Sequence, residues 1–144
     1  MSKHHLFTRV GYNYIPTTAI DESINWYKEN LGLKFINKFQ DRGSHIAVFH
    51  YPHQHAIATV LIETTDKAPF ELLRNGQPFP VMALNCVDID YTHQQMKEKG
   101  IKVDTIKPLG NGEAKYFYFR DNQGNLLEAA WSIWDTKDDI KEDF

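Results

Sequence analysis

The sequence has little cysteine, no long apolar run and no basic cluster, and each lack excludes a class of protein. Cys86 is the single cysteine among 144 residues, so a disulfide framework is excluded and a reducing compartment, the cytoplasm, is expected. No apolar stretch reaches the roughly 18 residues of a membrane-spanning helix, so we expect no membrane partner. The net charge is −3 and the Lys and Arg residues are dispersed. Since nucleic acids are bound through grouped positive charges, we expect no nucleic-acid partner either.

Aromatic residues, by contrast, are plentiful. The chain has nine Phe, seven Tyr and three Trp. Such side chains line the pockets of small organic ligands, and they also fill hydrophobic cores. Composition therefore predicts a globular domain and leaves a small-molecule site open as a function.

Two parts of the chain repeat one order of predicted elements: a strand, a helix and three further strands. The parts cover about residues 9–65 and 80–132, with a connector at 66–79 and an acidic tail at 135–144 that is expected to fray. Neither half alone buries the face of its sheet. We therefore predict one α+β domain, residues 1–144, in which two tandem βαβββ modules form a curved mixed sheet around a central cavity.

Both predicted helices carry start and stop signals. Thr18 is expected to cap the first helix, with Asp21 three residues later, and Asp88 is expected to cap the second. Gly32 and Gly100 are expected to end the two helices, because glycine readily adopts the left-handed conformation found there.

The closing strands of the two halves can also be matched. "LIET" (61–64) is laid over "LLEA" (126–129), and this places Glu63 opposite Glu128. Side chains alternate along a strand, so Glu128 shares one face with Leu126 while Leu127 lies on the other. We predict that both carboxylates face the cavity.

The duplication resembles the vicinal oxygen chelate superfamily, which includes glyoxalases, bleomycin-resistance proteins, fosfomycin-modifying enzymes and extradiol dioxygenases. The segments "DESINWYKENLGLKF" and "FRDNQGNLLE" carry the resemblance, which covers roughly residues 9–132. It implies a cavity inside the sheet and, in the metal-using members, a divalent ion at its centre. It also implies a homodimer, in some relatives with the halves exchanged between chains.

The resemblance gives Glu128 a specific place, the carboxylate-ligand position on the last strand. Metal-using relatives also have a His, or sometimes a Gln, on the first strand of each half, and these positions fall near Tyr12 and Val81. Tyrosine is an unusual metal ligand and valine cannot bind a metal at all. We therefore expect the inherited metal site to be incomplete.

Two functions of different classes follow. The first is a protein similar to the bleomycin-resistance branch, which binds a small organic molecule in the cavity and needs no cofactor. The second is a metal-dependent lyase, isomerase or dioxygenase, in which Glu128 binds Ni, Zn, Mn or Fe and a histidine such as His45 or His50 completes the site. A metal-free enzyme with Glu128 as general base is a further alternative. The candidate ligand-binding residues are Tyr12, Tyr14, His45, Glu63, Tyr118, Glu128 and Trp131, with Glu128 also the candidate metal ligand.

Overall fold

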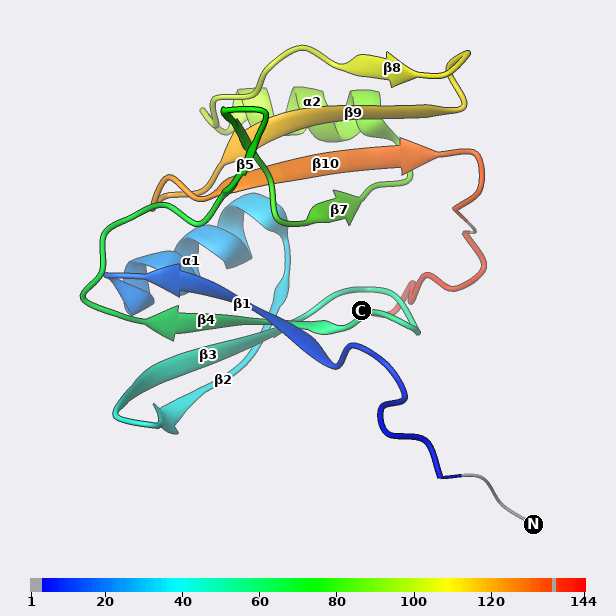
Figure 1. The fold of residues 1–144 in the computed structure, drawn as a ribbon. Coiled ribbons are helices and arrows are strands. Elements are labelled where there is room, and N and C mark those ends of the chain that lie inside the picture. Colours follow the sequence, from blue (N-terminus) through cyan, green and yellow to red (C-terminus); the bar gives the residue numbers. More distant parts are fainter. Residues whose placement is uncertain (1–3, 136) are drawn as a thin grey trace.

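The computed structural model describes residues 4–135 and 137–144. Within these residues, the chain forms two modules in succession, and each module has a four-stranded sheet and one helix (Figure 1). The first module contains β1 (Tyr12–Thr17), α1 (Ile20–Leu31), β2 (Lys34–Asp41), β3 (Ser44–His50) and β4 (Ala58–Glu63). The second contains β7 (Ala83–Asn85), α2 (Ile89–Glu98), β8 (Lys107–Leu109), β9 (Ala114–Arg120) and β10 (Leu126–Ser132). The α+β class and the two βαβββ modules are thus confirmed.

The two sheets have equivalent strand orders. Sheet 1 runs β1-β4-β3-β2 and sheet 2 runs β7-β10-β9-β8. In each sheet the first strand of the module pairs in parallel with the last, and the other pairs are antiparallel. β1 and β7 are edge strands of separate sheets. None of the described helices is both long and apolar enough to cross a membrane.

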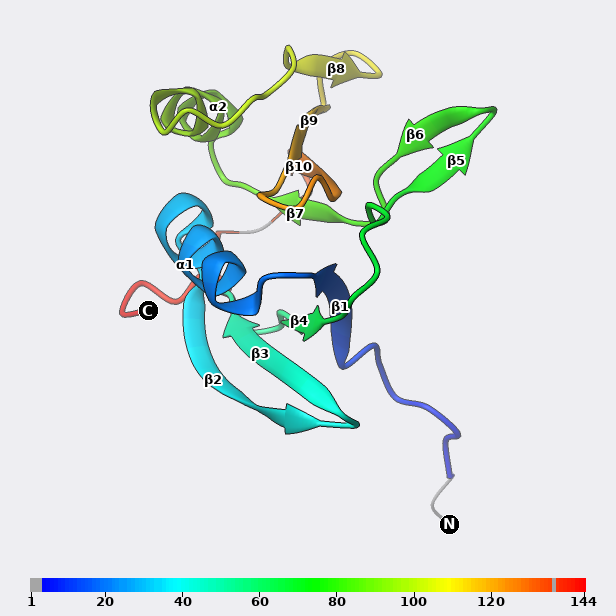
Figure 2. The same ribbon diagram turned by 90° about the vertical axis from the view of Figure 1, so that its left-hand side faces the viewer.

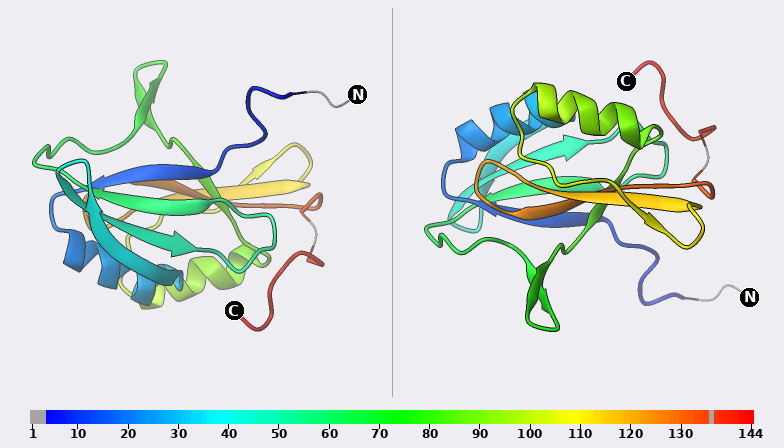
Figure 3. Two further views of the ribbon diagram at one scale, coloured as in Figure 1. Left: turned by 90° about the horizontal axis from the view of Figure 1, so that it is seen from below. Right: turned by 90° about the horizontal axis from the view of Figure 1, so that it is seen from above.

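Each sheet has a helix-facing side and an open side. Both helices lie on the same side of the strands (Figures 2 and 3), and the helix-facing side chains of the two modules form a single hydrophobic core. Its fully buried members include Ile15, Tyr27 and Phe49 from the first module and Phe117 and Leu127 from the second. The region between the helices and the two sheets is therefore mostly filled by side chains, apart from a hollow beside α2 lined by Asp88, Lys115 and Trp131. The open sides of the two sheets face outward.

The turn between β9 and β10 joins the modules. Asp121 accepts a hydrogen bond from the Tyr27 hydroxyl at 2.6 Å, and Asn125 Nδ2 donates to the carbonyl of Pro16 at 3.0 Å. Both of these turn residues are buried. The second module thus supplies polar partners to the end of β1 and to α1.

The same turn explains why the predicted cap of α1 is wrong. Ala19 is the N-cap and makes no side-chain capping bond. Thr18 instead donates from its N–H and its hydroxyl to Gln123 Oε1, at 2.8 and 2.9 Å. The other predicted signals are confirmed, because Gly32 ends α1 with φ +67° and Asp88 caps α2 by accepting from the Tyr91 N–H at 3.1 Å.

The predicted connector contains a hairpin. β5 (Leu72–Arg74) and β6 (Gln77–Phe79) are antiparallel, and the turn at Asn75 and Gly76 has positive φ at both residues. That combination defines a type I′ turn, for which Asn-Gly is the preferred sequence. The sequence did not predict these strands, because strands of three residues, one of them containing Pro78, are too short to show an alternating pattern.

Two further expectations differ from the structure. The strand expected directly after the second helix is only the three-residue β8, with an isolated bridge from Val103 to Phe119 before it. In the tail, residues near Ile140 are not frayed. Gln54 N–H donates to the Asp139 carbonyl at 2.8 Å, and Lys141 N–H donates to the Pro52 carbonyl at 3.0 Å. The tail is held by backbone pairing with the loop between β3 and β4.

Candidate functional site

Glu128 lies on the open side of sheet 2. It is directly opposite Tyr118 on β9 and Ala83 on β7, and residues paired across a sheet point to the same face. Its chain neighbours Leu127 and Ala129 are buried in the core on the helix-facing side. Alternation along β10 therefore turns the Glu128 carboxylate away from the core and toward the open side of sheet 2.

The Glu128 carboxylate is half-buried and makes no hydrogen bond or ion pair with another residue that the structure describes. Burial raises its pKa above the ordinary value of a glutamic acid. The pKa of the Tyr118 hydroxyl is also raised, first by burial and then by the charges of Tyr116 and Glu128. Water that would stabilise an ionised carboxylate is partly excluded here, and no donor from residues 4–135 or 137–144 replaces it.

Tyrosine rings form the floor beside Glu128. Tyr116 and Tyr118 project from β9 on the same face, with ring centroids 5.4 Å apart. Lys107 Nζ lies 5.8 and 5.7 Å from these two centroids. The Lys107 ammonium is paired with Asp104 at 2.9 Å, and this hydrogen bond raises the pKa of the lysine. A flat aromatic ligand could stack on this floor.

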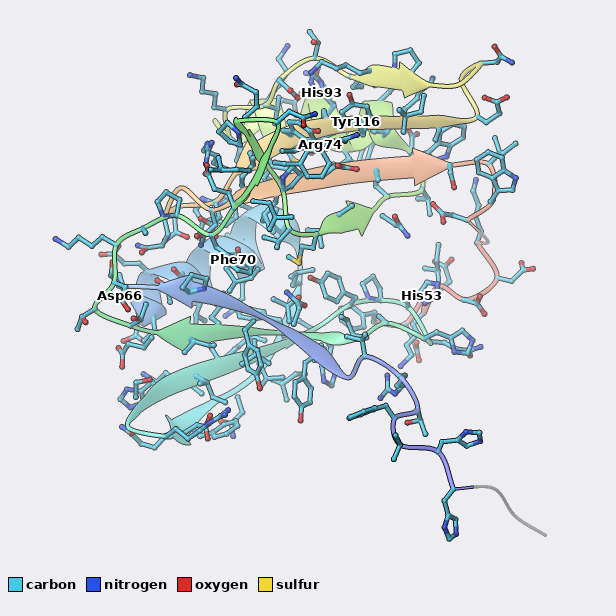
Figure 4. All side chains as sticks on the ribbon, viewed as in Figure 1. His53, Asp66, Phe70, Arg74, His93 and Tyr116 are labelled. Atoms are coloured by element: carbon cyan, nitrogen blue, oxygen red, sulfur yellow. The ribbon has the colours of Figure 1, made fainter. Side chains whose placement is uncertain are left out.

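The β5–β6 hairpin borders the same floor. Phe79 contacts the Tyr118 ring edge-on, with centroids 6.2 Å apart. The guanidinium of Arg74 lies 5.0 Å from the Phe79 centroid. Figure 2 shows the hairpin projecting from the side of sheet 2 opposite α2, and Figure 4 labels Arg74 on the hairpin and Tyr116 on β9. The sequence prediction omitted Lys107, Arg74 and Phe79. The Asn-Gly sequence at residues 75–76 of the connector is the signal that could have revealed the hairpin.

Tyr12 and Tyr14 lie on the open side of the other sheet. Their rings contact each other edge-on at 6.0 Å, and they are 59% and 38% exposed. Phe39 lies on the same side of sheet 1 and is 43% exposed. Within one chain these aromatic residues are thus on a different surface from Glu128.

His45 and Glu63 form a pair on the helix-facing side of sheet 1, so Glu63 does not share the orientation of Glu128. His45 Nδ1 lies 3.1 Å from Glu63 Oε1, and the His45 N–H donates to the same oxygen at 3.2 Å. The core residue Leu61 corresponds in orientation to Leu127, whereas the sequence match had placed it over Leu126. A one-residue slip in matching strands reverses every side chain.

Trp131 is also separate from the Glu128 surface. It shares the helix-facing side of β10 with Leu127 and Ala129 and packs against the core. Lys115 Nζ lies 5.7 Å from its ring. Of the other six candidate ligand-binding residues, the structure therefore places only Tyr118 beside Glu128. Tyr12 contacts Tyr14, and His45 is paired with Glu63, on other surfaces.

The His45–Glu63 pair predicts a pH-dependent stability. Hydrogen bonds from the His45 backbone and side chain lower the pKa of Glu63 below its unfolded-state value. Ionised Glu63 thus stabilises the fold above the unfolded-state pKa, and this contribution is lost as the pH falls through the lower folded-state pKa. We expect Glu63→Gln to lower Tm at pH 7, and the deficit to shrink as the pH falls from neutral through the lowered folded-state pKa of Glu63. Thermal unfolding across that range measures it, and a deficit that does not change with pH would contradict the assignment.

No group of three or more His, Cys, Asp or Glu suited to holding a metal occurs within residues 4–135 and 137–144. Tyr118 and Ala83 are the residues opposite Glu128 across the sheet, and neither is a usual ligand. His55 is drawn toward the tail, with Nε2 3.7 Å from Asp139.

Comparison with known proteins agrees with the two-module architecture. A sequence model of the Glyoxalase/Bleomycin resistance protein/Dioxygenase superfamily matches residues 4–129. No curated protein matches the chain. TnmS3, an antibiotic binding protein from Streptomyces sp. CB03234, has a similar structure, with a TM-score of 0.71, 18% identity, and coverage of 90% of this chain and 99% of TnmS3.

Two further solved structures are similar over almost their whole lengths. FosX, a fosfomycin resistance protein from Listeria monocytogenes, has a TM-score of 0.67 and 12% identity, covering 90% of this chain and 97% of FosX. A glyoxalase family protein from Enterococcus faecalis has a TM-score of 0.67 and 16% identity, covering 88% and 99%. At such identities the similarity establishes a shared fold.

Proposed function

Because the chain belongs to the glyoxalase/bleomycin resistance protein/dioxygenase superfamily, we propose that it binds a small aromatic molecule on the open side of sheet 2 without the family's full metal site. The observation that carries the proposal is the half-buried Glu128 carboxylate, which has no hydrogen-bond partner among the described residues and lies beside two tyrosine rings. TnmS3, whose fold is shared, is described as an antibiotic binding protein.

The energetics of Glu128 favour a ligand that donates a hydrogen bond. A carboxylate that loses water without gaining a donor costs free energy, and a ligand O–H or N–H would remove that cost. Charge-assisted hydrogen bonds of this kind are about twice as strong as neutral ones. The rings of Tyr116 and Tyr118 would meanwhile stack on the apolar part of the ligand.

A homodimer is the second part of the proposal. The open side of sheet 1 exposes Tyr12, Tyr14 and Phe39, and it also has a hollow lined by Tyr14, Asp41 and Ile46. Aromatic residues in one patch are typical of protein interfaces. We propose that this face packs against the open side of sheet 2 of a second copy, so that Glu128 becomes enclosed and a cytoplasmic dimer carries two ligand sites.

The test uses 2-naphthol, a flat neutral molecule with one hydroxyl donor, in equilibrium dialysis with tag-free protein. Tyr118→Ala should weaken binding about tenfold because the stacking surface is lost. Glu128→Gln should weaken it about fivefold because a charged acceptor becomes a neutral one. Glu142→Gln removes the same charge from the exposed tail and should change nothing.

Two results would overturn this function. The first is 2-naphthol binding that is absent or unchanged in Tyr118→Ala and Glu128→Gln. The second is near-stoichiometric Ni, Zn, Mn or Fe in purified protein, measured by mass spectrometry, that disappears in Glu128→Ala. The second result would favour the metal-dependent lyase, isomerase or dioxygenase with Glu128 as a ligand.

A further inference from the structure

We propose that the β5–β6 hairpin is the second wall of this ligand site, and that Arg74 binds an anionic group on the ligand. The inference rests on the proposed function and narrows its ligand class. The ligand would be a flat aromatic molecule with an anionic group at one end and a hydrogen-bond donor at the other.

The pairing of the hairpin decides which side chains face the site. Leu72 is opposite Phe79, and Arg74 is opposite Gln77. These four residues share one face of the hairpin, because paired residues point to the same side and alternate along each strand. The contact of Phe79 with Tyr118 shows that this face is turned toward the open side of sheet 2.

The base of the hairpin is anchored to sheet 2. Phe70 N–H donates to Asn125 Oδ1 at 2.8 Å, and the Leu126 N–H donates to the Phe70 carbonyl at 3.4 Å. Glu71 forms an ion pair with Arg120 at 2.8 Å. Phe70 and Arg74, at the base and near the tip, are both labelled in Figure 4. Three contacts at one end fix the direction of the hairpin, and the exposed tip remains available to a ligand.

The cationic side chains around the site differ in whether they already form an ion pair with a carboxylate. Lys107 is paired with Asp104, and Arg120 is paired with Glu71. Arg74 lies over the Phe79 ring and makes no ion pair or hydrogen bond within the described part of the chain. Its guanidinium therefore keeps its N–H donors for a ligand, in the planar arrangement that suits a carboxylate.

The positions of Arg74 and Glu128 define which end of the ligand carries its anionic group. Arg74 lies on Phe79, Phe79 contacts Tyr118, and Tyr118 is opposite Glu128. A cation thus stands at one end of an aromatic surface and an acceptor stands at the other. A ligand with its anionic group at Glu128 would meet repulsion there, so the anion belongs at Arg74 and the donor belongs at Glu128.

The experiment compares three naphthalenes by equilibrium dialysis with the full chain. 6-Hydroxy-2-naphthoate has both groups, 2-naphthoate only the anion, and 2-naphthol only the donor. We expect 6-hydroxy-2-naphthoate to bind the wild type about tenfold more tightly than 2-naphthol does. Arg74→Gln should weaken both naphthoates about tenfold and change 2-naphthol less than twofold. Arg9→Gln removes the same charge from an exposed site outside the hairpin and should change none of the three.

Each outcome has one meaning. Loss of naphthoate affinity in Arg74→Gln but not in Arg9→Gln supports the proposal. If 2-naphthol binding depends on Tyr118 while Arg74→Gln leaves the naphthoates unchanged, the anion assignment is overturned and the proposed function stands. If none of the three binds, or if Tyr118→Ala changes none of them, the proposed function fails and this inference fails with it. Far-UV circular dichroism and Tm of each variant confirm that the fold is retained.

Discussion

Asp121→Ala is expected to lower the free energy of unfolding by about 3–5 kcal/mol. Asp121 is 7% exposed and accepts four hydrogen bonds. Oδ1 accepts from the backbone N–H groups of Gln123 and Asn125, at 2.8 and 3.0 Å. Oδ2 accepts from the Tyr27 hydroxyl at 2.6 Å and from Asn125 Nδ2 at 2.9 Å. Truncation leaves these buried donors without an acceptor, which is more costly than the loss of a surface contact.

The loss is measured by urea unfolding monitored by tryptophan fluorescence at one protein concentration. Asp143→Ala, in the exposed tail, is the matched control and should change the free energy of unfolding by less than about 0.5 kcal/mol. Tyr27→Phe removes one of the four donors, and about 1–2 kcal/mol is expected. A loss under about 1 kcal/mol for Asp121→Ala would mean that this turn does not hold the modules together.

Tyr12→Glu is expected to weaken the proposed homodimer at least about 100-fold, equivalent to about 3 kcal/mol. The side chain is 59% exposed in the single chain, so the monomer should fold normally. A two-fold dimer contains the substituted residue twice, and each copy loses an aromatic contact and places a charge where the partner excludes water. The effect therefore appears in association and not in Tm of the monomer.

Sedimentation velocity at micromolar concentrations measures this dissociation. Tyr91→Glu is the matched control, because Tyr91 is 62% exposed on α2, on the other side of the sheet from the proposed interface. It should leave the dimer intact. A wild type that stays monomeric at 100-fold higher concentration would refute the dimer, and an unaffected Tyr12→Glu dimer would show that the interface lies elsewhere.

The element order could be predicted from the sequence because both helices and most strands are long enough to show a period. The helix stop at Gly32 and the cap at Asp88 act within one turn of chain, so they too could be predicted. The cap at Thr18 was wrong because Gln123, distant in sequence, occupies its side chain. Local sequence patterns cannot reveal a hydrogen-bond partner that comes from the other module.

Of the candidate site, the orientation of Glu128 could be predicted from the sequence, whereas the other residues could be predicted only in part. Alternation along β10 gave the orientation of Glu128 relative to Leu127 correctly. The sequence match of Glu63 with Glu128 was wrong because the hydrophobic pattern of these strands does not distinguish two alignments that differ by one residue. The burial of Leu61 in the structure does distinguish them. Arg74 was missed because its position over Phe79 arises from a hairpin too short to be recognised from alternation.

The junction at residues 121–125 also constrains the order of events during synthesis. Its contacts with the first module, at Tyr27, Ser23, Thr18 and Pro16, span 94 to 109 residues of sequence. The start of α1 therefore gains these partners only after residues 121–125 have left the ribosome. Contacts of such long range slow folding. Until the second module is made, the core residues of the first module lack the partners with which they share one hydrophobic core, and they stay exposed to other nascent chains. A fast-translating host should thus yield more aggregated protein than a slow or cooled one.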